Sequence, residues 1–90
     1  MYMYYQLLKN APPHDTPEFL TYLKEHNGVL FENDDWLVIT NVKYGHPTAF
    51  AKVDNPSIGV LIEKYGNLEW RVKPANIRTI PNRFHIHFIN

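Results

Sequence analysis

The chain has 90 residues, 44% of them hydrophobic and 14% aromatic, and its nine basic and nine acidic residues give a net charge of zero at pH 7. This composition excludes a disordered chain, and the balanced charge argues against both a simple electrostatic nucleic-acid binder and an acidic mimic of DNA. The absence of cysteine excludes disulfides and thiolate metal sites. The length predicts one domain over residues 1–90, with a strand and a helix in 1–27 and a β-barrel-like sheet in 28–90.

The charged residues are unevenly placed along the chain. Residues 1–45 contain three basic and six acidic side chains, whereas residues 46–90 contain six basic and three acidic ones. No apolar run approaches the ~18 residues of a membrane span, and the N-terminal sequence MYMYYQLLKN is unlike a secretory signal. We therefore expect a cytoplasmic protein with a two-sided surface and no membrane contact.

The N-terminal part predicts a strand followed by a helix. Tyr2–Leu8 is rich in aromatic residues, which favour strands, and two prolines then interrupt the chain. Asp15 or Thr16 can cap a helix whose first position suits Pro17. Asn27-Gly28 is typical of a helix end, so this helix has about ten residues and must pack on a sheet to be stable.

From Gly28 onward the pattern is that of short strands separated by turns. Strands are expected at Val29–Phe31, Trp36–Val42 and Thr48–Val53. Asn33-Asp34-Asp35 is interpreted as a turn, because acids and amides are frequent there, and not as a paired-carboxylate site. Trp36–Val42 carries apolar residues on both faces, which indicates a central strand.

The stretch from Ser57 to Pro81 predicts a β-hairpin and a further short strand. Tyr65-Gly66-Asn67 separates two apolar runs, and Gly66 would supply the positive φ of a short hairpin loop. The first arm alternates from Ile58 to Glu63. In the second arm one face is apolar and the other charged, with Leu68, Trp70 and Val72 opposite Glu69, Arg71 and Lys73.

The last segment, Arg83–Ile89, alternates in the same way. Apolar Phe84, Ile86 and Phe88 share one face, and Arg83, His85 and His87 share the other. Side chains two residues apart on a strand lie ~6–7 Å apart, close enough to share one phosphate or one metal ion. A guanidinium binds phosphate through two hydrogen bonds and imidazoles transfer protons. The alternative, a solvated polar face, is the interpretation that we prefer.

A metal site would need a third ligand besides the two histidines of this strand. His46 and Asp54 are the candidates, but nothing in the spacing joins them to His85 and His87. No metal and no cofactor is therefore predicted.

The run GHPTAFAKVDNPSIGVLIEKYGNLEWRVKPANIRTI resembles the latter part of an SH3-like barrel, as in Tudor-type modules and the C-terminal barrel of retroviral integrases. In those folds a strand, a hairpin and a 3₁₀ turn lead into a final short strand. The resemblance implies a small, mainly β, SH3-like antiparallel barrel, here with one short N-terminal helix and extra terminal strands. Tudor modules use an aromatic cage. Trp36, Tyr44, Phe50 and Tyr65 could supply its walls, although we expect Trp36 and Phe50 in the core.

The sequence RFHIHFI at Arg83–Ile89 also resembles the signature of the histidine-triad nucleotide hydrolases and transferases, with arginine in the first histidine place. That resemblance implies His85 as a nucleophile towards an α-phosphate and His87 as a phosphate-binding partner. The helix that the family places before its signature has no counterpart here.

The candidate binding residues belong to a basic ridge on the hairpin, to the last strand and to the tyrosines, which are enriched in binding hot spots. The basic ridge consists of Arg71, Lys73 and Arg78. The candidates on the last strand are Arg83, His85 and His87, and the tyrosines are Tyr2, Tyr4, Tyr44 and Tyr65. His85 and His87 are the catalytic candidates, although no catalytic motif favours an enzyme.

Three functions follow from these patterns. The first is a non-enzymatic binding module that contacts a protein partner as an inhibitor or adaptor, of the kind found among phage and mobile-element accessory proteins. The second is nucleic-acid binding through the basic ridge, and the third is nucleotide binding or phosphotransfer on the last strand. The terminal strands resemble edge strands, so a homodimer is also open.

Overall fold

A computed structural model describes residues 11–40, 45–72 and 83–89. In these ranges the chain forms two helices and five strands. They are α2 (Pro17–His26), β1 (Val29–Glu32), β2 (Trp36–Thr40), β3 (Pro47–Ala51), α3 (Gly59–Tyr65), β4 (Glu69–Arg71) and β5 (His85–Ile89). Neither helix has the length and apolar character needed to cross a membrane. The predicted strand at 2–8 lies outside the described residues.

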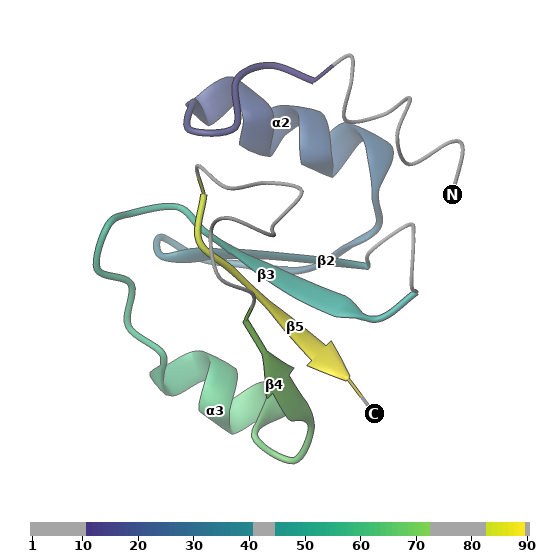
Figure 1. Cartoon of the computed structure of the whole chain (residues 1–90), viewed down its shortest axis with the longest axis vertical. Helices are drawn as coiled ribbons and strands as arrows, with labels where there is room; N and C mark the ends of the chain where they lie inside the picture. Colours follow the sequence, from purple (N-terminus) through teal and green to yellow (C-terminus); the bar gives the residue numbers. More distant parts are fainter. Residues whose placement is uncertain (1–10, 41–44, 73–82, 90) are drawn as a thin grey trace.

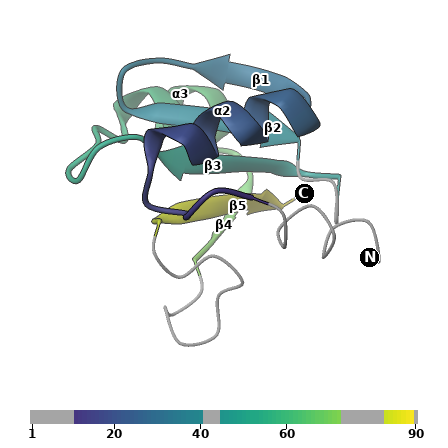
Figure 2. The same cartoon turned by 90° about the horizontal axis from the view of Figure 1, so that it is seen from above.

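The five strands form one antiparallel sheet in the order β1-β2-β3-β5-β4. The helices α2 and α3 lie on opposite sides of this sheet (Figures 1 and 2). The fold is therefore mainly β, as expected, but the described strands are not closed into a barrel. The SH3-like plan is not confirmed.

The alternation of β2 and β3 divides the core into two clusters. On the α2 side, Phe19 and Leu23 of the helix pack with Leu37, Ile39 and Phe50. On the α3 side the buried residues are Trp36, Val38, Ala49, Ala51, Leu61, Ile86 and Phe88. β2 contributes to both clusters and lies between β1 and β3, so it is an interior strand with two buried faces, as its sequence predicts.

Helix α2 has the predicted ends. Pro17 occupies its first turn after Thr16, and Asn27 follows its last residue in an extended conformation. The Thr16 hydroxyl donates to the Pro13 carbonyl at 2.7 Å, so it closes the preceding turn and does not cap the helix. Asn27 donates its side-chain amide to the Leu23 carbonyl at 3.0 Å.

The first arm of the predicted hairpin is wrong, since Gly59–Tyr65 is an α-helix. Leu61 is fully buried, and Val60 and Tyr65 pack against the same core, so residues at helical spacing cover the sheet. The predicted positive φ at Gly66 is also wrong, because Gly66 has φ −63° and donates its N–H to the Ile62 carbonyl. A Cβ at this position would clash with the Ile62 carbonyl oxygen, which explains the glycine without a left-handed turn.

The second arm is partly as predicted. Glu69–Arg71 forms the edge strand β4, with Leu68 and Trp70 against the core and Arg71 exposed. Val72, expected on the apolar face, is 45% exposed. In β5, Ile86 and Phe88 are buried as predicted, but Phe84 precedes the strand and is 42% exposed.

Candidate functional site

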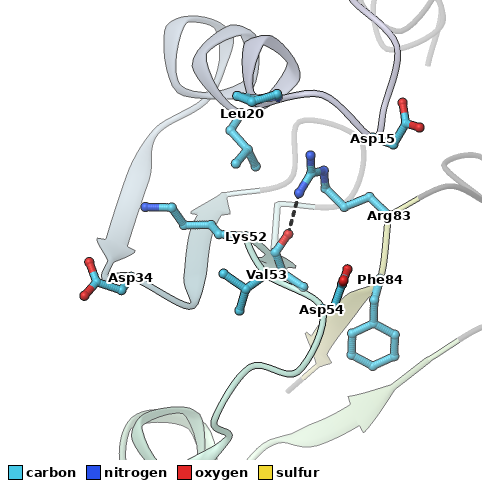
Figure 3. A pocket seen from close by; sticks show the side chains of 10 residues that line it. Asp15, Leu20, Asp34, Lys52, Val53, Asp54, Arg83 and Phe84 are labelled. Carbon is cyan, nitrogen blue, oxygen red and sulfur yellow. Dashed lines mark hydrogen bonds between the residues drawn. The ribbon is translucent and has the colours of Figure 1, made fainter.

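Arg83, the first residue of the predicted phosphate site, is used inside the fold. Its Nε donates to the His14 carbonyl at 2.7 Å, Nη1 to the Ala51 carbonyl at 2.6 Å and Nη2 to the Thr16 carbonyl at 2.9 Å. Three of the five N–H donors of the guanidinium are therefore engaged by main chain. They join the turn before α2 to the end of β3, and Figure 3 shows the bond to Ala51. Burial lowers the pKa of Arg83, and nearby Asp15 opposes that shift.

His85 is a buried residue of the α2 side, only 7% exposed. Its ring stacks on Phe50 with centroids 5.2 Å apart and an interplanar angle of 20°. Its Nδ1 lies 3.0 Å from the Arg83 carbonyl oxygen. Because a carbonyl only accepts, Nδ1 carries the hydrogen. This hydrogen bond fixes the orientation of the His85 ring against Phe50.

His87 contacts a histidine that the sequence does not associate with it. Its Nδ1 lies 3.0 Å from Nε2 of His46 and 3.3 Å from Oγ1 of Thr48. The His85 and His87 rings meet edge to face at 5.2 Å. Burial lowers the pKa of His46, and the charge of Arg71 adds to that effect. Cross-strand pairing explains the contact, because Thr48 on β3 lies opposite His87 on β5.

The three histidines do not make a metal centre that can be recognised from the structure. Within residues 11–40, 45–72 and 83–89, no group of three or more histidine, aspartate or glutamate side chains is arranged to hold a metal ion. Asp54, the other candidate ligand, lines the cavity beside Arg83 that is described below.

The basic ridge is described only at one residue. Arg71 is exposed on β4 and forms a salt bridge to Glu69, with Nη2 2.6 Å and Nε 3.1 Å from Oε2. The other residues of the ridge and three of the tyrosines fall outside the described part of the chain. They are Lys73, Arg78, Tyr2, Tyr4 and Tyr44. The ridge stays a prediction.

Tyr65 packs as a core residue. Its ring stacks on Phe88 with centroids 4.6 Å apart and an angle of 14°, and burial raises the pKa of Tyr65. Its carbonyl accepts a hydrogen bond from the Trp70 indole at 3.0 Å. Trp36 and Phe50, the other described residues of the hypothetical cage, are buried in the two clusters as expected.

Among the described residues, an open space lies beside Arg83, between the N-terminal end of α2 and the loop that follows β3. One cavity of about 480 Å³ is bordered by Leu20, Val53 and Arg83, and Leu20 points into it from α2 (Figure 3). A second cavity of about 330 Å³ lies between Trp36, Pro56 and Ile58. Both are lined by Asp54 and Phe84, so the two cavities adjoin at these residues, and we call the pair of cavities the groove.

Exposed apolar side chains border this groove. Val53 is 46%, Ile58 48% and Phe84 42% exposed. Exposed apolar groups gathered around a concavity are typical of binding sites, whereas isolated ones are not informative. We call Val53, Asp54, Ile58 and Phe84, with the flanking carboxylates of Asp15 and Asp34, the groove surface.

The backbone beneath the groove surface is held at several points. The Lys52 N–H donates to the Asp35 carbonyl at 2.8 Å, and the Ala51 N–H donates to the Phe84 carbonyl at 3.0 Å. Asp35 also accepts from the Ser57 N–H at 3.2 Å, and the Trp36 indole donates to the Ser57 carbonyl at 2.7 Å. The loop of residues 52–58 is thus fixed at both ends before any partner arrives.

The turn at residues 33–35 has the predicted form. The Asn33 side-chain oxygen accepts from the N–H groups of Asp35 and Trp36, at 2.9 and 2.7 Å. This turn places Asp34 at the groove. Sequence reasoning missed the groove surface because Phe84 alternates with core residues, and only the turn sequence Asp54-Asn55-Pro56 marks the loop.

Comparison of the chain with protein-family models, curated proteins and solved structures finds no match in any of the three.

Proposed function

We propose that this protein is a non-enzymatic binding module that contacts a protein partner through the groove surface, as an inhibitor or adaptor in the cytoplasm. One observation carries the proposal: three half-exposed apolar side chains border two adjoining cavities, Val53 the first, Ile58 the second and Phe84 both. Burial of such side chains by a partner is favourable by about 25 cal/mol per Å² of apolar surface. Because the loop beneath is already fixed, binding loses little conformational entropy there.

The internal contacts of the last strand support the same proposal. Arg83 donates to three carbonyls and His85 to one, so both side chains hold the backbone beside the groove. We call these internally bonded side chains the frame.

The proposal is tested by affinity capture with two matched variants. Val53→Asp introduces a charge at the groove, and Val29→Asp introduces the same charge on β1 at a site of nearly equal exposure, 45% against 46%. A partner that purified wild-type and Val29→Asp proteins bind directly, and that Val53→Asp does not, supports the groove.

Other outcomes of the same experiment overturn the proposal. Loss of the partner with Val29→Asp alone would place the contact on β1. Capture that nuclease treatment abolishes would instead favour nucleic-acid binding.

A further inference from the structure

The charges around the groove surface differ in whether they already have partners. Lys52 donates at 2.8 Å both to the Glu32 carboxylate and to the Asn33 carbonyl. The hydrogen bond from Lys52 is the main reason why the pKa of Glu32 is lowered. The other cation at the groove, Arg83, is held by three carbonyls. Lys52 is therefore paired with a carboxylate, whereas the neutral carbonyls around Arg83 satisfy its N–H groups and leave its positive charge.

The carboxylates at the groove, unlike Lys52, have no oppositely charged partner in a salt bridge among the described residues. Asp15, Asp34 and Asp54 come from three separate segments, are all exposed and line the same cavity. Within the described ranges none of the three forms a salt bridge, since the pairs there are Lys24–Glu32, Lys52–Glu32 and Arg71–Glu69. These three carboxylates outnumber Lys52 and Arg83, the two cations that line the same cavity, so the groove surface has an excess of negative charge around an apolar centre.

We propose that the groove surface binds a segment of a partner protein in which an apolar side chain is flanked by lysine or arginine. This inference rests on the proposed function and names the chemistry of its partner. The apolar side chain would enter the cavity between Ile58 and Phe84, and the cationic groups would lie against Asp34 and Asp54. The cavity volumes lie in the range of roughly 300–1,000 Å³ that is usual for ligand sites.

The same charges disfavour a polyanion at this place. A phosphate backbone would approach three carboxylates, against Arg83 and a Lys52 that is already paired with Glu32. Nucleic acid, if it binds this protein, should therefore bind at another surface. Complementary charge acts mainly on the association rate and on the choice of partner, and its effect falls as salt rises.

A peptide selection tests this inference. The whole chain is used to select binders from a random peptide display library, and the enriched peptides are synthesised and measured at low and high salt. We expect enriched sequences with one large apolar residue between lysines or arginines, and weaker binding at high salt.

Matched variants separate local charge from net charge. Asp34→Asn with Asp54→Asn removes two carboxylates from the groove while keeping the side-chain shape. Glu25→Gln with Glu63→Gln removes two exposed carboxylates from α2 and α3, outside the groove lining. We expect the groove pair to weaken a selected peptide about tenfold at low salt, and the control pair to weaken it less than about twofold.

The outcomes distinguish this inference from the function on which it rests. Enriched peptides that are acidic or uncharged but lose binding with Val53→Asp would overturn the basic partner and leave the groove in place. Equal loss with both pairs of variants would also overturn it, because only net charge would then matter. Peptides whose binding Val53→Asp does not change would contradict the groove function itself.

Discussion

Arg83 and Phe84 are neighbours in the chain and have opposite fates. Arg83, with a side chain suited to ligands, donates to three carbonyls of its own fold. Phe84, with a side chain suited to a core, is 42% exposed beside two cavities. The polar side chains expected on the last strand thus belong to the frame, whereas the groove surface is the region that we propose contacts a partner. A side chain's chemistry indicates what it can bind, and only the fold decides whether the partner is internal.

Arg83→Met gives the largest expected effect on stability. It removes three hydrogen bonds from a charged donor and leaves the carbonyls of His14, Thr16 and Ala51 without that partner. We expect the free energy of unfolding to fall by about 3 kcal/mol, measured by urea denaturation.

Arg83→Lys is the matched control for charge. Lysine keeps the positive charge but lacks the planar fork, so we expect it to recover less than half of the loss. Full recovery by lysine, or a loss below about 0.5 kcal/mol in Arg83→Met, would mean that Arg83 is not part of the frame.

His85→Ala gives the next largest effect. It removes the ring stacked on Phe50 and the hydrogen bond to the Arg83 carbonyl, in a site that is nearly closed to solvent. We expect a loss of about 2 kcal/mol in the free energy of unfolding. Unchanged stability together with loss of binding to a nucleotide would reverse the comparison and restore the catalytic hypothesis for His85 and His87.

The elements around the frame are predictable from the sequence where their signals are local. Pro17 and Asn27 mark the ends of α2, and the alternation of Ile86 and Phe88 gives the buried face of β5. The carbonyls that accept from Arg83 belong to Ala51, Thr16 and His14, which are separated from it by 32, 67 and 69 positions in the sequence. Every residue has a carbonyl, so no pattern of residue types indicates which carbonyls will meet an arginine.

The prediction of a strand at the position of helix α3 is wrong for a different reason. It has seven residues, of which only Leu61 is buried, so its helical period is barely visible. Isoleucine, valine and tyrosine favour strands, and packing against the sheet overrides that preference. Phe84 shows the same limit for the site, because one step before the start of β5 its side chain lies outside the core that strand alternation predicts for it.

The histidine contact predicts a pH dependence of the frame. Burial and Arg71 lower the pKa of His46, so the folded state favours the neutral ring. The unfolded chain then binds more protons, and the stability from this group is present above pH ~6.5 and lost as the pH falls below it. The hydrogen bond between Nε2 of His46 and Nδ1 of His87 needs one nitrogen as acceptor, so it is lost only when both rings are protonated.

His46→Gln tests this dependence. A glutamine amide can replace Nε2 as a hydrogen-bonding group but does not titrate. We expect a smaller decrease in the free energy of unfolding between pH 7.5 and about 5 than in the wild-type chain, measured by urea denaturation at each pH. Some dependence should remain, because burial also lowers the pKa of His14. An unchanged pH profile in both His46→Gln and His87→Asn would show that the pair is not coupled to folding.

The smallest expected effect on stability is at the groove surface. Val53 is nearly half exposed and lies on the loop after β3, so Val53→Asp removes little buried area. We expect its free energy of unfolding to change by less than about 0.5 kcal/mol, although it should abolish capture of the partner. The two measurements must be made on the same preparation, because loss of binding with intact stability is what separates a contact residue from a frame residue. A loss of stability as large as that of Arg83→Met would place Val53 in the frame and remove the contrast between the two regions.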